Sequence, residues 1–139
     1  MLLIFAGSSD ALSAEHTSRF LVPFLLWLDP AISYQAIEAI HLVLRKIGHF
    51  TEYAILATLL WRALRGTFTS VPRRCIAAAA LLVAAAFAIS DEFHQSFVPS
   101  RTAAVHDVCI DFIGAAIAVL LCTTISRAKI GSAGPLIES

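Results

Sequence analysis

Residues 75–90, CIAAAALLVAAAFAIS, form an uncharged run, and residues 91–95, DEFHQ, end it with two acids, a histidine and an amide. As a helix the uncharged run spans about 24 Å, which is short of the roughly 30 Å hydrocarbon core of a bilayer. We therefore predict a transmembrane helix that extends beyond this run at both ends. Asp91 or Glu92 should then lie at or slightly below the membrane surface.

The composition of the 139-residue chain is that of a membrane protein. Hydrophobic residues make up 58% of it, charged residues only 14%, and the mean hydropathy is +0.80, whereas a soluble domain has about 25% charged residues. The formal net charge is zero, so nothing electrostatic supports nucleic-acid binding. The cysteines are widely spaced and include no CxxC pair, so neither a disulfide framework nor a thiolate zinc site is indicated.

Two further segments are long and apolar enough for spans of about 17 residues or more. Residues 47–64 qualify if His49 and Glu52 can be accommodated, and residues 108–126 qualify with Asp111 inside them. The N-terminal MLLIFAG is too short to cross and lacks the basic region of a signal peptide. We expect it to be the end of a span, either because the true start lies upstream or because the first helix is shortened.

Residues 29–46, DPAISYQAIEAIHLVLRK, predict a further helix with Asp29 as its cap and Pro30 in its first turn. Apolar residues recur along one face, as in a helix that lies on the membrane surface, although packing against other helices would give the same pattern. The apolar stretch before it, residues 18–30, is expected to be broken at Pro23. The predicted fold class is therefore all-α: a small polytopic membrane helix bundle with three full transmembrane helices, a truncated N-terminal one and an interfacial helix.

Basic residues predict the orientation. The connection between the second and third spans, with the helix end before it, contains four arginines and no acid, and the C-terminal tail is also basic, so both should be cytoplasmic. Every acid except Glu138 then lies toward the outside. Four basic residues lie on that side as well, interleaved with the acids: Arg19, Arg45, Lys46 and Arg101.

Polar side chains recur at helical spacing at three helix ends on the predicted outer side. Each group contains residues three or four positions apart, which can share a helix face. The groups are His49, Glu52 and Tyr53; Asp91, Glu92 and Gln95; and Asp107, Asp111 and Gly114. The glycine of the third group would let another helix approach closely.

Depth decides where two of these acids should point. Glu52 and Asp111 lie roughly 6 to 8 Å below the rim of their predicted spans at 1.5 Å per residue. An ionised acid facing lipid costs about 2.5 kcal/mol or more. We therefore expect both to face inward, into a shallow polar pocket that opens to the outer leaflet.

The charge balance of this pocket is uneven. Five carboxyl groups stand against one permanent cation, Arg101, which the turn at Pro99 would deliver. Like charges this close together do not all stay ionised, so some acids should be protonated or a cation should be bound. Arg101 is expected to be the central partner because its guanidinium can hold two carboxylates and stay charged. Three histidines can add positive charge at lower pH: His49, His94 and His106.

Three motifs in this order, KIGHFTEY (46–53), SDEFHQSFVPSR (90–101) and DVCIDFIG (107–114), resemble the VanZ-like family of small bacterial membrane proteins. Its founding member is associated with low-level resistance to the glycopeptide antibiotic teicoplanin. The resemblance implies a transmembrane domain over residues 1–126, a short cytoplasmic tail over 127–139, and a multi-pass location in the bacterial cytoplasmic membrane. The family's first helix ends in a serine pair, which IFAGSSD matches here. The implied ligand-binding signature is His49, Glu52, Tyr53, Asp91, Glu92, Gln95, Arg101, Asp107 and Asp111.

Three functions remain open, and the family implies no settled reaction. The first is binding of a lipid-linked cell-wall intermediate, an amphiphilic antibiotic or a lipid headgroup, with Arg101 and His49 at its polar part and its acyl chain in the bilayer. The second is acid/base catalysis on a lipid-linked substrate. The third is a scaffold ordered by a buried ion-pair network. The candidate catalytic residues are His49, Glu52, Asp91 and Glu92.

The predicted partners beyond such a ligand are few. The bilayer is one, and a homo-oligomer is compatible with helices that enclose so little volume. We expect no cofactor and no metal, since H-x-x-E is too short a pattern to define a metal site. A metal variant of the enzyme would use His49, Glu52, Asp91, Glu92 and His94 as ligands.

Overall fold

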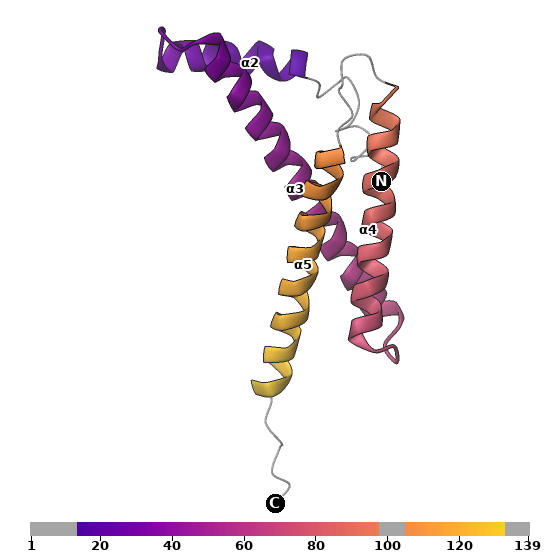
Figure 1. Cartoon of the computed structure of the whole chain (residues 1–139). Coiled ribbons are helices and arrows are strands. Elements are labelled where there is room, and N and C mark those ends of the chain that lie inside the picture. The colour runs from indigo at the N-terminus through magenta and orange to yellow at the C-terminus, as the bar shows by residue number, and fades with distance from the viewer. Residues whose placement is uncertain (1–13, 98–104, 133–139) are drawn as a thin grey trace, which may run out of the picture.

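The computed structural model describes residues 14–97 and 105–132. Within these ranges the chain forms four helices and no strand, which confirms the all-α prediction. The helices are α2 (Ala14–Leu28), α3 (Tyr34–Thr67), α4 (Arg73–Gln95) and α5 (Val105–Ser132). Figure 1 shows α4 and α5 running in opposite directions, α3 crossing them obliquely, and α2 lying across the N-terminal end of α3.

Two helices are long and apolar enough to cross a membrane: Arg73–Gln95, which is α4, and His106–Ser126 within α5. Both contain runs predicted to span. By the same measure α3 does not qualify, because polar residues of its middle part, such as His49 and Glu52, lower its hydropathy. Two of the three predicted full spans are thus supported by length and composition, whereas the one at 47–64 stays a prediction. The truncated N-terminal helix falls on residues outside the described ranges.

The predicted interfacial helix and the span after it are a single helix. α3 runs without interruption through 34 residues, about 51 Å at 1.5 Å per residue. It contains no proline, and its glycines do not break it. The predicted cap at Asp29 was wrong: Ser33 caps α3 by accepting from the Ala36 amide at 3.2 Å, while Asp29 accepts from the Ala31 amide at 3.0 Å in the preceding turn.

The predicted break at Pro23 was also wrong, since α2 continues through it. Proline removes one helical hydrogen bond and crowds the preceding turn, which kinks a helix as often as it ends one. Pro23 is exposed, so its ring displaces no packed neighbour. Much of the apolar surface of α2 is exposed too, with Phe20 and Trp27 each 78% accessible.

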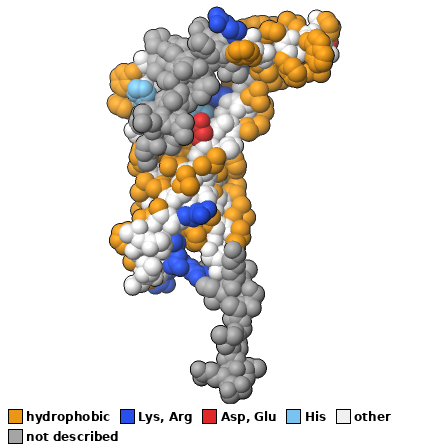
Figure 2. Space-filling view, turned by 180° about the vertical axis from the view of Figure 1, so that it is seen from behind, with side chains coloured by type: hydrophobic (Ala, Val, Ile, Leu, Met, Phe, Trp, Pro, Cys, Tyr) orange, Lys and Arg blue, Asp and Glu red, His pale blue; other side chains and the backbone are white. Residues whose placement is uncertain are grey.

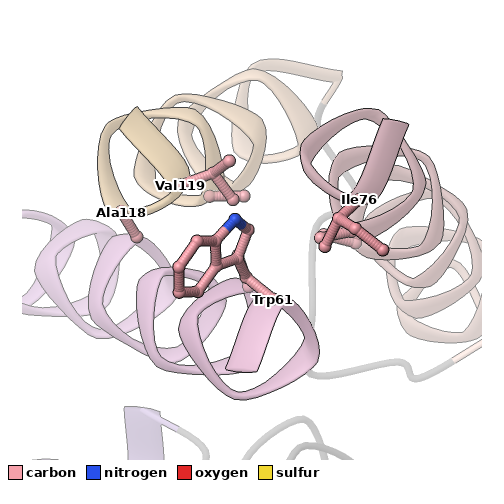
Figure 3. Close-up of a cluster of buried hydrophobic side chains, with 8 residues drawn as sticks. Trp61, Ile76, Ala118 and Val119 are labelled. Atoms are coloured by element: carbon pink, nitrogen blue, oxygen red, sulfur yellow. The ribbon is translucent and has the colours of Figure 1, made fainter. Parts of the chain in front are cut away.

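The apolar core lies where α3, α4 and α5 meet. Trp61 of α3 packs with Ile76 of α4 and with Ala118 and Val119 of α5 (Figure 3). Small residues make this approach possible: the fully buried face of α4 repeats alanine every four residues, at Ala80, Ala84 and Ala88.

Large apolar side chains cover much of the outside of the same three helices (Figure 2). Examples are Leu59 on α3, Leu82 on α4 and Leu120 on α5, each more than half exposed. This surface suits lipid contact better than water. Basic side chains gather at the end of the bundle where α3 connects to α4, away from the buried acids (Figure 2). They are Arg62, Arg65, Arg73 and Arg74.

Candidate functional site

A group of polar side chains is buried between α3, α4 and α5 at the end of the bundle opposite the arginines. The inner faces of these helices change from apolar to polar toward this end. On α4, for example, the alanine stripe gives way to Asp91, Glu92 and Gln95, all buried. We call this group the polar cluster; its members are Arg45, Lys46, His49, Glu52, Tyr53, Asp91, Glu92, Gln95, Asp107 and Asp111.

Asp107 of α5 joins two consecutive basic residues of α3. Its Oδ2 accepts from Arg45 Nη2 at 2.9 Å, and its Oδ1 accepts from Lys46 Nζ at 3.4 Å. The carboxylate is buried while the two cations are partly exposed, so the cations cover it on its solvent side. These ion pairs form the outer layer of the polar cluster.

Asp111, one turn further along α5, pairs with His49 of α3. The His49 Nδ1 and Asp111 Oδ1 atoms are 3.1 Å apart, and both side chains are buried. Glu52, the other candidate catalytic residue of α3, lies one turn from His49. The structure instead pairs the imidazole across the helix interface with Asp111, and Glu52 is half-buried.

Gln95 connects the third helix to the other two. Its Nε2 donates to Asp91 Oδ2 at 3.0 Å, and its Oε1 accepts from Arg45 Nη2 at 3.4 Å. Arg45 therefore bridges α3 to both α4 and α5. The amide supplies one donor and one acceptor, so it links a carboxylate to a guanidinium without adding charge.

Burial deepens along the cluster from one end to the other. The side-chain exposure falls from 46% at Lys46 and 26% at Arg45 to 8% at Asp107 and 1% at Asp111. Tyr53, one turn beyond His49 on α3, is fully buried. We call Lys46, Arg45 and Asp107 the rim, and Asp111 with Tyr53 the floor. This matches the predicted order of depth for Asp107 and Asp111.

Both floor residues have unused hydrogen-bonding capacity. The hydroxyl of Tyr53 and the Oδ2 atom of Asp111 are buried and have no hydrogen-bond partner in the described part of the chain. Tyr53 lies one turn along α3 from His49, the partner of Asp111. Two further buried nitrogens of α3, Arg45 Nε and His41 Nε2, likewise lack partners in the described part of the chain. Most buried polar atoms in proteins are satisfied, so these unsatisfied atoms distinguish this end of the bundle and mark it as a candidate binding site.

Most of the residues predicted to form the signature lie toward one end of the bundle, and their role in binding stays a prediction. The structure places eight of the nine predicted signature residues in the polar cluster: His49, Glu52, Tyr53, Asp91, Glu92, Gln95, Asp107 and Asp111. Arg101, predicted to be the central cation, lies outside the described residues. His94 and His106 are both exposed.

Two cations of the site were not assigned to it from the sequence. Arg45 and Lys46 were noted only as basic residues on the acidic side, whereas they hold Asp107. The spacing could have indicated Arg45, because it lies four residues before His49 and therefore on the same face of α3. Among the described residues, no three His, Cys, Asp or Glu side chains are arranged to hold a metal ion, so the metal variant gains no support.

The family model described as VanZ/LLP1 matches residues 1–126, which include α3, α4 and most of α5. The chain belongs to the VanZ/LLP1 family. This confirms the resemblance carried by the three motifs. No curated protein matches the chain, and no solved structure matches it. Together with the two apolar helices, membership of the VanZ/LLP1 family indicates a membrane protein.

Proposed function

We propose that this VanZ/LLP1 protein is a multi-pass protein of the bacterial cytoplasmic membrane. We further propose that its polar cluster opens toward the outer leaflet and binds the polar head of an envelope amphiphile. A lipid-linked cell-wall intermediate, an amphiphilic antibiotic and a lipid headgroup are the candidate ligands. In this arrangement α3 contains the second span, and the arginines of the α3–α4 connection lie in the cytoplasm.

The observation that carries the proposal is the unused hydrogen-bonding capacity at the floor. A network that only stabilised the fold would be expected to satisfy its buried atoms, because each unsatisfied one costs about 1 to 3 kcal/mol. Asp111 Oδ2 and the Tyr53 hydroxyl are nevertheless left without a partner in the described residues. A ligand that hydrogen-bonds to both would offset this cost.

The surroundings of the cluster suit a molecule with a polar head and an apolar tail. The outward faces of α4 and α5 at this level carry large exposed apolar side chains, including Ile89, Phe93 and Phe112. An acyl chain lying along these faces would remain in the bilayer while its head reached the cluster. Ionisable residues inside membrane helices commonly mark such sites.

Photo-crosslinking tests the proposal directly. The full chain is reconstituted in nanodiscs with a diazirine-bearing phospholipid or a diazirine-bearing polyprenyl phosphate, and labelled peptides are mapped by mass spectrometry. We expect labels on α3 and α5 beside the cluster, reduced several-fold in His49→Gln and unchanged in Glu38→Gln, an exposed acid outside it. Equal labelling of the wild type and His49→Gln would favour the scaffold hypothesis.

One observation favours the enzymatic alternative. His49 is oriented by a buried carboxylate, as an imidazole that transfers protons commonly is, and the Tyr53 hydroxyl lies on the next turn. The reaction class would be hydrolysis or transfer on a lipid-linked substrate. Incubating the reconstituted protein with a polyprenyl phosphate or diphosphate, and analysing the lipids for a product that His49→Gln does not form, tests this alternative.

The resemblance to the VanZ-like family also connects the chain with glycopeptide resistance. Expression in a susceptible bacterium should raise the minimum inhibitory concentration of teicoplanin if this connection extends to the chain. Replacing Arg101 by Ala or Lys should abolish that effect without loss of membrane insertion if the arginine contacts the ligand. An unchanged phenotype in both variants would count against a role for Arg101.

A further inference from the structure

We propose that the floor of the polar cluster binds a primary ammonium group carried by an amphiphile, with Asp111 and Tyr53 as its direct ligands. This inference rests on the proposed function and names the chemistry of the head that the cluster recognises. It follows from the charge of the cluster, the identity of its unsatisfied atoms and the layout of its ion pairs.

The charge of the cluster favours a cation. Five carboxyl groups gather there, against two permanent cations among the described side chains. The carboxyl groups are Glu52, Asp91, Glu92, Asp107 and Asp111, and the cations are Arg45 and Lys46. Protonation of His49, or the addition of Arg101, would still leave the acids in excess. An excess of buried negative charge is costly, and a bound cation offsets it.

The unsatisfied atoms at the floor accept hydrogen bonds. Asp111 uses Oδ1 for His49, so its Oδ2 remains available as an acceptor. The Tyr53 oxygen can accept as well, and Tyr53 lies one turn along α3 from His49, the partner of Asp111. A primary ammonium has three N–H donors, enough for both atoms and for one further carboxyl oxygen.

Other occupants fit these observations less well. A buried water could bridge the two atoms but would not offset the acidic excess. A metal ion would need several ligands converging on one point, and the described part of the chain contains no such group of three. A quaternary ammonium has no N–H and could not donate to Asp111 or Tyr53. The unpartnered N–H at Arg45 Nε would favour an anion, but at the rim rather than at the floor.

The arrangement of the ion pairs provides an ammonium group with a path from the rim to the floor. Near the rim, the hydrogen bonds and ion pairs that hold α3 to α5 are those of Asp107 with Arg45 and Lys46. Both cations are partly exposed and can be hydrated when these ion pairs open, which limits the cost of opening. Deeper in the bundle the apolar core around Trp61 holds the helices together. An ammonium group can therefore reach Asp111 when the rim opens, without disturbing the core.

Native mass spectrometry of the full chain in nanodiscs tests this inference. The probes are phosphatidylethanolamine, with a primary ammonium; phosphatidylcholine, with a quaternary one; phosphatidylglycerol, with none; and a polyprenyl phosphate. We expect phosphatidylethanolamine to be retained about tenfold better than phosphatidylcholine, as suits hydrogen bonds to a charged group. Asp111→Asn and Tyr53→Phe should each abolish this preference, and Glu38→Gln should preserve it.

Tyr53→Phe keeps the aromatic ring, so the test survives if Asp111→Asn fails to fold. Dodecylamine, added as a competitor, distinguishes the source of the ammonium. If it displaces phosphatidylethanolamine, the ammonium group alone suffices for binding. If it does not displace the lipid, the rest of the lipid head is also needed. Equal retention of phosphatidylcholine, or a preference that survives both variants, would overturn the inference.

The same panel separates this inference from the proposed function. Retention of phosphatidylglycerol or the polyprenyl phosphate that depends on the polar cluster, with no preference for an amine, overturns the ammonium site and leaves amphiphile binding intact. If every probe is retained and no variant of the polar cluster changes its retention, both the ammonium site and amphiphile binding are overturned.

Discussion

Gly114 of α5 packs directly against the backbone carbonyl of Phe50 in α3. On α5 this contact lies between Asp111 of the polar cluster and Ala115 of the apolar core. The glycine thus marks the point where two differently stabilised halves of the α3–α5 interface meet. A side chain at this position would push both halves apart.

Gly114→Ala should therefore destabilise the protein by about 2 to 3 kcal/mol, as overpacking commonly does. A Cβ here would collide with the Phe50 carbonyl oxygen and lie 3.1 Å from the carbonyl carbon. Gly48→Ala is the matched control, since a Cβ there meets nothing within 4 Å. The control should be neutral or more stable because alanine favours helix. Thermal unfolding in detergent micelles measures both, and equal midpoints would contradict the packing argument.

Removing either partner of the Arg45–Asp107 ion pair should lower the stability of the protein, but by unequal amounts. Arg45→Met leaves a buried carboxylate with only Lys46 beside it, whereas Asp107→Asn leaves an arginine that is 26% exposed and can be hydrated. We expect a loss of about 2 kcal/mol for the first and about 1 kcal/mol for the second. Chemical unfolding in mixed micelles would show the order, and a larger loss for Asp107→Asn would be inconsistent with it.

The His49–Asp111 pair should show strong coupling in a double-mutant cycle. Either His49→Leu or Asp111→Leu leaves one polar group buried, at a cost of about 3 kcal/mol. The double variant buries neither group, so its loss should be clearly smaller than the sum of the two single losses. Unfolding of the four proteins in the same detergent provides the cycle. Additive losses would mean that the two side chains do not interact.

Trp61 should be the largest single contributor to the apolar core. Trp61→Ala would leave a cavity between α3, α4 and α5 and cost about 3 to 5 kcal/mol. Trp61→Phe should cost much less, because the indole N–H it removes has no partner among the described residues. Trp27→Ala, at a 78% exposed position on α2, serves as the control and should leave the unfolding midpoint nearly unchanged.

Cysteine labelling tests the orientation. After the three native cysteines are replaced by alanine, a single cysteine is placed at Lys46 or at Arg74. A membrane-impermeant thiol reagent should modify the first in intact cells and the second only after lysis, because arginines mark the cytoplasmic side. The opposite pattern would place the polar cluster on the cytoplasmic side and remove the proposed contact with the outer leaflet.

Much of the fold follows from local properties of the chain. The length of the uncharged run at 75–90 predicted α4, and the helical spacing of polar residues predicted which side chains share a face. The i, i+4 and i+7 positions of Asp107, Asp111 and Gly114 do form one stripe against α3. Spacing along one helix is a local quantity, so it can be computed without knowing the neighbours.

Other features depended on the packing of helices against one another. Two successive helical patterns look the same whether or not they join, so the continuity of α3 through residues 34–67 was not predicted. Pro23 is compatible with both a kink and an end, and the structure shows that α2 continues.

The sequence by itself determined an all-α membrane protein with its acids gathered at one end and identified most of the residues buried there, since burying charge in a bilayer is too costly to be accidental. Only the tertiary structure decided which side chains pair. Asp107 meets Arg45 and Lys46, and His49 meets Asp111 rather than Glu52. These pairings depend on the rotation and register of α3 against α5, which the close contact at Gly114 and the small residues of the core fix.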